Sequence, residues 1–268
     1  MSELQPNVEG LKPPTTLKEE PTYNFPVETV ELPSKGLVYP ESSPLSEGKI
    51  IMKYMTAKEE DIITNQNYIS KGTAIDHLLQ ALIVTPGVKE SDLIVGDKNA
   101  ILIAARVLGY GANYKFEYMG DQVEVDLSSL ENKEIDYSLL EGRTNEFEFT
   151  LPHTQTPITF RILTGKIEQA INSELKGQAK INKNASKEMS TRMMYLIMSV
   201  NGDSERKTVR DFVNNSLLAR DAKALRDHIA KFQPDVAMKF DWEDYDGTLV
   251  EREIPITSGF FFPDPEWG

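Results

Sequence analysis

Two stretches of the chain share one pattern, and this pattern decides the expected fold. Residues 49–61 read KIIMKYMTAKEED, and residues 158–168 read ITFRILTGKIE. Each begins with a short apolar run and continues through a threonine, Thr56 or Thr164, into a helix-type sequence. Thr56 is followed three positions later by Glu59, which is the spacing of a capping box at a helix start. The sequence therefore predicts two related strand–helix starts.

An alternating aromatic segment follows each start at a distance. The aromatic positions are Tyr114, Phe116 and Tyr118 in the first segment, and Phe240 and Trp242 in the second. Charged residues stand between them, which is typical of a hairpin with one apolar and one charged face. Asp246-Gly247 is the strongest short hairpin signal in the chain. Each unit is therefore expected to carry one β-hairpin ribbon.

The predicted fold class is α+β, with two related helical units that each carry an antiparallel β-hairpin ribbon. An extended N-terminal arm over residues 1–30 precedes them, because five prolines interrupt that stretch. We expect that its deletion leaves the fold intact. The remaining boundaries are 31–130 for the first strand–helix–ribbon unit, 131–157 for a connector with a strand, and 158–268 for the second unit with its aromatic tail.

Further elements follow from caps and periodicity. Pro33-Ser34-Lys35-Gly36 predicts a tight loop in which Tyr39 is anchored. Helices are predicted from Thr73, from Asp97 as an N-cap, over residues 187–200, and over the apolar pattern that leads to Phe232. Residues 146–151 alternate cleanly and predict a strand that Pro152 ends.

Composition excludes several classes of protein. The chain has 268 residues, no cysteine and a net charge of −13. Without cysteine there is no disulfide, thiol catalysis or cysteine-ligated metal, and with this net charge nucleic acid is a poor partner. No run of 18 apolar residues predicts a membrane span, and the N-terminus lacks the pattern of a secretory signal. We therefore expect a protein made in a cytoplasm, without membrane contact.

No catalytic motif is recognisable. His77, His153 and His228 are far apart in the sequence, and the chain has neither a phosphate-binding loop nor a nucleophile elbow. Four acidic residues between Asp241 and Asp246 resemble a calcium loop, but aromatic residues interrupt them and the twelfth position is Arg252. The expectation is a protein that is not an enzyme and has no catalytic, cofactor-binding or metal-binding residues.

Charge is distributed unevenly along the second unit, and two of its charged segments can each be interpreted in two ways. Residues 235–268 hold nine carboxylates and two basic residues, which form either a solubilising face or a docking surface for a basic partner. Lys176, Lys180, Lys183 and Lys187 form either a solvated helix face or a contact for nucleic acid or an acidic partner.

Large aromatic side chains are the candidates for contacts with a partner protein. Three successive phenylalanines at 260–262 cannot all face one core from a strand, because neighbouring side chains point to opposite sides. Aromatic residues are also enriched at interface centres. The candidates are Tyr39, Tyr114, Phe116, Tyr118, Phe240, Trp242, Tyr245, Phe260, Phe261, Phe262 and Trp267.

Four short motifs, in this order, resemble one known family. They are LPSKG at 32–36, KYMTAKEED at 53–61, RVLGYGANY at 106–114 and FFFP at 260–263. The chain is similar over about residues 30–263 to the baseplate hub protein family of T-even-like contractile-tailed bacteriophages. Relatives often carry cysteine pairs in the ribbons, like a zinc knuckle, where this chain has residues 118–121 and 242–245. No metal is therefore expected at the hairpin tips.

The resemblance implies a structural component of the phage tail baseplate, located in the virion and in contact with other baseplate or tail subunits. A symmetric assembly within the tail is compatible with this role. Two alternatives stay open. One is a transient assembly chaperone that is absent from the mature virion. The other is a hydrolase, which requires two carboxylates that converge in a cleft, and the sequence identifies no such pair.

Overall fold

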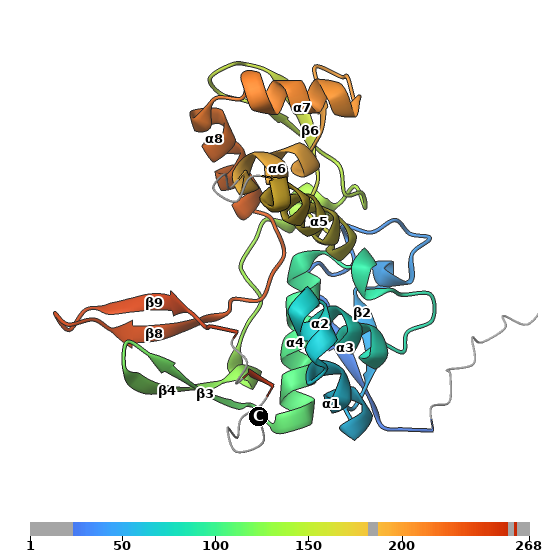
Figure 1. Cartoon of the computed structure of the whole chain (residues 1–268), viewed down its shortest axis with the longest axis vertical. Helices are drawn as coiled ribbons and strands as arrows, with labels where there is room; N and C mark the ends of the chain where they lie inside the picture. The colour runs from blue at the N-terminus through green and yellow to red at the C-terminus, as the bar shows by residue number, and fades with distance from the viewer. Residues whose placement is uncertain (1–23, 182–186, 257–259, 262–268) are drawn as a thin grey trace, which may run out of the picture.

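The computed structural model describes residues 24–181, 187–256 and 260–261, and it has an α+β fold. Figure 1 shows two helical bodies stacked along the long axis, with two β-hairpins that project side by side from one flank. One continuous hydrophobic core runs through both bodies and into the hairpins, from Val30 to Phe261. The predicted fold class is therefore confirmed.

The first unit forms the lower body of Figure 1. Its strands β1 (Val27–Glu31) and β2 (Lys49–Lys53) pair antiparallel. The capping box between Thr56 and Glu59 is present and starts the first helix, as predicted. The helices are α1 (Ala57–Ile63), α2 (Gln66–Lys71), α3 (Ala74–Leu82) and α4 (Val95–Tyr110), and the hairpin consists of β3 (Asn113–Tyr118) and β4 (Asp121–Asp126). Short 3-10 turns lie at η1 (Pro44–Glu47), η2 (Glu90–Asp92), η3 (Leu127–Ser129) and η4 (Tyr137–Leu140).

The second unit forms the upper body. Its antiparallel sheet has the order β5 (Phe147–Thr150), β6 (Pro157–Phe160), β7 (Ile197–Val200). Its helices are α5 (Gly165–Ile181), α6 (Glu188–Leu196), α7 (Arg206–Asn215) and α8 (Ala219–Ala230). The hairpin of β8 (Lys239–Glu243) and β9 (Leu249–Glu253) turns near Asp246-Gly247, as predicted, and Gly247 has a φ of 80°.

The chain follows a similar path in both units, although the number of helices at each step differs. Each begins with an antiparallel strand pair, and after its helices the chain returns to the second strand. Met52 in β2 pairs with Ile83 in an isolated bridge, and Phe160 in β6 pairs with Ile197 in β7. A helical segment and a hairpin complete each unit. This repeated path supports the predicted relation between the units.

A constant spacing strengthens the relation. Asp97 and Asp221 are each the third residue of a helix, α4 and α8 respectively, and they lie 124 positions apart. Phe116 and Phe240 in the two hairpins have the same separation. The correspondence therefore holds in register from the helix into the hairpin.

Several predicted boundaries are wrong. Residues 27–30 of the expected arm belong to β1, where Val30 is buried, so deletion of residues 1–30 removes a strand that pairs with β2. Strand β5 lies in the expected connector but pairs with β6 and so belongs to the second sheet. Residues 197–200 form strand β7 instead of the end of a helix, because Ile197 and Val200 pair with β6. Residues 1–23 lie outside the described part of the chain.

The two units meet along α4. Val95 N–H donates to the Leu163 carbonyl and Gly165 N–H to the Leu93 carbonyl, so a short antiparallel bridge joins the start of α4 to the start of α5. Gly96 lies against the backbone carbonyl of Pro234, and a Cβ at position 96 would come within 1.9 Å of that oxygen. Only glycine fits so close an approach of two backbones.

Candidate interaction surface

The aromatic faces of the two hairpins pack against each other. The ring of Tyr118 lies 5.3 Å from that of Phe240 and 5.0 Å from that of Trp242, in both cases edge to face. Phe116 meets Phe240 at 5.2 Å in the same way. Such pairs contribute about 0.5–1.5 kcal/mol beyond the burial of their area. The two ribbons therefore form one small sandwich, which we call the paddle (residues 113–126 and 239–253).

The described part of the aromatic tail folds back onto the paddle. Phe260 packs edge-on against Tyr114 at 5.0 Å, and the Tyr114 hydroxyl donates to the Pro255 carbonyl at 2.8 Å. Phe260 and Phe261 are buried. Phe262 and Trp267 lie outside the described residues. The described tail thus closes the base of the first hairpin.

These contacts correct the expectation that the aromatic candidates are exposed to a partner. Alternation puts the rings on one face of each hairpin, and the two faces cover each other, which the sequence does not reveal. Tyr118 and Trp242 are half-buried at the sandwich edge. The candidates buried within the chain are Tyr39, Tyr114, Phe116, Phe240, Phe260 and Phe261.

The tips of the paddle hold large apolar side chains that face solvent. Tyr245 is 95% exposed and Leu249 is 70% exposed at the tip of the second hairpin, and Met119 is 66% exposed at the tip of the first. Of these three residues, only Tyr245 is among the candidates predicted from the sequence. Met119 lies in a turn and Leu249 follows one, at positions where polar residues are usual. A large apolar residue at such a position indicates an exposed contact residue. The tips are exposed anchors of the kind found at interface centres.

A broad groove of about 1110 Å³ runs along the base of the second hairpin. Its lining includes four apolar residues, Val236, Met238, Ile254 and Ile256. Both lysines in its wall are engaged, because Lys133 donates to the Ala230 carbonyl and Lys239 pairs with Glu251. Its acidic residues are Glu131, Glu134, Asp235, Asp241, Glu251 and Glu253. The groove therefore presents negative charge together with apolar side chains.

Opposite charge lies at the other end of the molecule. Residues 158–231 contain 14 Lys and Arg against 8 Asp and Glu, although the whole chain is acidic. Lys207 and Arg210 on α7 and Arg220 on α8 are exposed and belong to none of the ion pairs found among the described residues. Figure 1 shows α7 and α8 at the top of the upper body, well apart from the hairpins. The molecule thus has a basic and an acidic pole.

The start of α4 holds a buried polar network. The Asp97 carboxylate accepts hydrogen bonds from Ser34 N–H at 2.9 Å, from the Ser34 hydroxyl at 2.7 Å and from the Tyr39 hydroxyl at 2.6 Å. Burial raises the pKa of Asp97 to about 6, and these hydrogen bonds oppose the rise. Ile94 N–H donates to the Tyr39 oxygen. Tyr39 is therefore anchored as predicted, but the N-cap of α4 is Ile94 and not Asp97.

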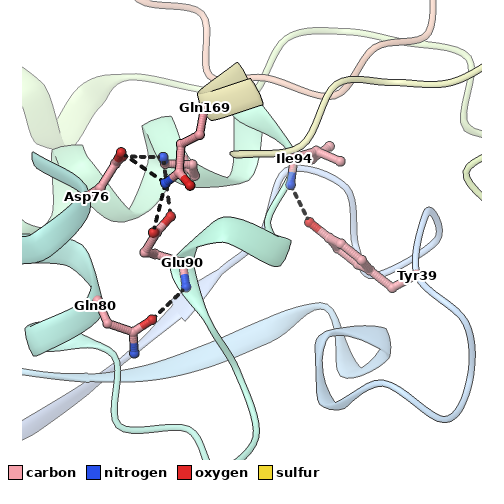
Figure 2. Close-up of polar contacts among 7 residues, drawn as sticks. Tyr39, Asp76, Gln80, Glu90, Ile94 and Gln169 are labelled. Atoms are coloured by element: carbon pink, nitrogen blue, oxygen red, sulfur yellow. Dashed lines mark hydrogen bonds and ion pairs between the residues drawn. The ribbon is translucent and has the colours of Figure 1, made fainter. Parts of the chain in front are cut away.

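A second polar cluster joins the units and includes two carboxylates. Lys98 Nζ lies 2.7 Å from Asp76 and 3.6 Å from Glu90, and the amide of Gln169 on α5 donates to both acids at 3.2 Å. Figure 2 shows Asp76, Glu90 and Gln169 facing one another. Burial raises the pKa of Glu90, and Lys98 opposes that rise. Lys98 and Gln169 bind both acids, so the cluster links α3, α4 and α5 through polar contacts.

Three of the four motifs of the family resemblance converge on α4. Ser34 of the first motif binds its N-terminal turn through Asp97. Glu60 of the second accepts from the Tyr110 hydroxyl at 2.8 Å. Arg106 of the third is buried and donates to the carbonyls of Gly111 and Asn113, which lead into the first hairpin. The motifs therefore mark positions that set the path of the chain around this helix.

Within the described residues, no group of three or more His, Asp or Glu side chains is arranged to hold a metal ion. None of the helices in this part of the chain has the length and apolar character that a membrane span requires.

Comparison with known proteins gives no match: no family model, no curated protein and no solved structure shows significant similarity to this chain.

Proposed function

We propose that this chain is a non-enzymatic structural component of a contractile phage tail baseplate, at or next to the hub. The observation that carries the proposal is the paddle, a projection that is packed internally and keeps Met119, Tyr245 and Leu249 exposed at its tips. A projection of this kind suits insertion between neighbouring subunits, because its aromatic interior fixes its shape before contact.

The family resemblance supplies the assembly context. Its motifs gather around α4 and include Arg106, whose buried guanidinium holds the turn from which the first hairpin starts. One residue that suggests the family, Arg106, is therefore also one that fixes the start of the first hairpin. This role links the resemblance to a contact-making function instead of to a catalytic centre.

Mass spectrometry of purified virions of the phage that encodes the chain tests the proposal. We expect the chain in intact particles at a fixed ratio to the other baseplate subunits. Its absence from particles, together with its presence in baseplate complexes from infected cells, would instead establish the transient chaperone.

Tip variants test the paddle itself. Tyr245→Ala together with Leu249→Ser should lower incorporation into particles, because the exposed anchors are lost. Ile69→Ser on α2 is the matched control, since Ile69 is also a large, exposed apolar residue but lies away from the hairpins. Equal incorporation of the tip variant and the control would show that the paddle is not the contact.

A further inference from the structure

The acidic and basic poles of this molecule are complementary, and each has a distinct shape. The acidic pole is concave, since it contains the groove at the base of the second hairpin, which is lined by six carboxylates and several apolar residues. The basic pole is convex, because α7 and α8 form the end of the upper body.

The basic pole also carries an apolar projection. Leu218, at the N-cap of α8, is 51% exposed. Arg220 is two residues further along the same helix, and Lys207 and Arg210 lie on α7, the preceding helix. A surface that exposes cations and the apolar Leu218 is complementary to a groove lined by carboxylates and apolar residues, because hydrophobic contact gives affinity while the charges set orientation.

One molecule cannot join its own poles. Figure 1 places α7 and α8 at one end of the molecule and the hairpins at the flank of the other body. The single continuous core fixes this arrangement, since both bodies and the hairpins share it. A contact between the poles therefore requires two molecules.

We propose that the basic α7–α8 surface of one copy docks in the acidic groove of a second copy. Leu218 enters the groove near Val236 and Ile254, and the cations of α7 and α8 face Glu131, Asp241 and Glu253. Because the two surfaces differ, the contact is head-to-tail, and it continues into a ring or a filament according to the rotation between neighbours. This inference concerns the purified chain alone and does not depend on the proposed baseplate role.

Sedimentation equilibrium of the full chain provides the first test. Salt screens exposed charges, with a Debye length of roughly 10 Å at about 0.1 M and roughly 3 Å at about 1 M. We expect self-association at the lower salt concentration, with the dissociation constant at least about tenfold weaker at the higher one. A chain that is monomeric at both salt concentrations, up to the highest protein concentration that stays soluble, overturns the proposal.

Charge reversal locates the contact. The groove variant carries Glu131→Lys, Asp241→Lys and Glu253→Lys, and the head variant carries Lys207→Glu, Arg210→Glu and Arg220→Glu. Each should be monomeric alone, because like charges then face each other. An equimolar mixture should associate again, since each reversed surface now finds an oppositely charged one.

Two controls separate this contact from general charge effects. Glu41→Lys, Glu47→Lys and Glu141→Lys together change the net charge as the groove variant does, but at exposed positions outside the groove. This control should associate like the unaltered chain. Leu218→Ser should weaken association with no change in charge. Loss of association in the control, or no restoration in the mixture of two variants with native circular dichroism, contradicts the head-to-tail contact.

Discussion

Asp97 and Asp221 hold equivalent places in the two units but have opposite electrostatic character. Each is the third residue of its helix, and each reaches back to the loop between the first two strands of its unit. Asp97 binds Ser34 and Tyr39, while Asp221 accepts from the backbone N–H groups of His153 at 2.8 Å and Thr154 at 3.1 Å. In both units, an aspartate in the first turn of a helix therefore binds the loop between the first two strands.

The donors explain the difference in pKa. Burial opposes ionisation of Asp221, but the hydrogen bonds from His153 and Thr154 outweigh it and lower its pKa. Burial dominates at Asp97 and raises its pKa to about 6. The comparison shows that a repeated structural contact need not keep the same response to pH, because the balance between desolvation and hydrogen bonding decides it.

The largest effect on stability is expected in the two equivalent strands β2 and β6. Phe160 in β6 and Met52 in β2 are both fully buried and both pair with the returning chain. Phe160→Ala should lower the free energy of unfolding by about 3–5 kcal/mol, and Met52→Ala by about 2–5 kcal/mol. Urea unfolding followed by circular dichroism measures both. A loss below about 1 kcal/mol in one unit alone would break the equivalence of the strands.

The two aspartates predict opposite pH responses. Because the pKa of Asp97 is raised, its contribution is fully present below the unfolded pKa and is lost as the pH rises through about 6. The loss amounts to about 3 kcal/mol for a shift of roughly two units. Urea unfolding from about pH 4 to about pH 7 should therefore show that Asp97→Asn removes this part of the pH dependence.

Asp221→Asn should act in the other direction. Its lowered pKa means that Asp221 stabilises the fold above the unfolded pKa and that this contribution disappears as the pH falls through the folded value. The deficit of this variant relative to the unaltered chain should therefore shrink in acid. A deficit that grows as the pH falls would refute the assignment.

Two helical glycines test how tightly the junction between the units is packed in comparison with the surface. Gly96→Ala should cost about 1–3 kcal/mol or more, because the new methyl group meets the Pro234 carbonyl. Gly177→Ala on α5 is the matched control, since a Cβ there meets no atom within 4 Å, and it should stabilise the helix by up to about 1 kcal/mol. Thermal unfolding of both variants tests this, and equal effects would argue against a tight junction.

The smallest effect is expected at the paddle tip. Tyr245→Ala should change the free energy of unfolding by less than about 0.5 kcal/mol, because the side chain is almost fully exposed. Trp242→Ala, three residues earlier, should cost clearly more since it removes the ring contact with Tyr118. Differential scanning calorimetry separates the two, and a large loss at Tyr245 would mean that the tip packs on the chain.

The local sequence determined the elements and their kinds. Local elements depend on residues that are close together in the sequence and can therefore be predicted from it. Examples are the capping box at Thr56, the hairpin turn at Asp246-Gly247 and the alternation of the aromatic segments. The same holds for the α+β class.

Tertiary structure alone decided what those elements cover. Alternation shows that Phe116 and Phe240 share a hairpin face, but only packing shows that the two faces meet each other. The Asp97 carboxylate looked like a helix cap, yet it binds Ser34, which lies 63 positions earlier. The acidic groove likewise joins residues 129–134 to residues 235–241. Such contacts depend on which segments, far apart in the sequence, pack together in the core, and local sequence patterns do not determine this.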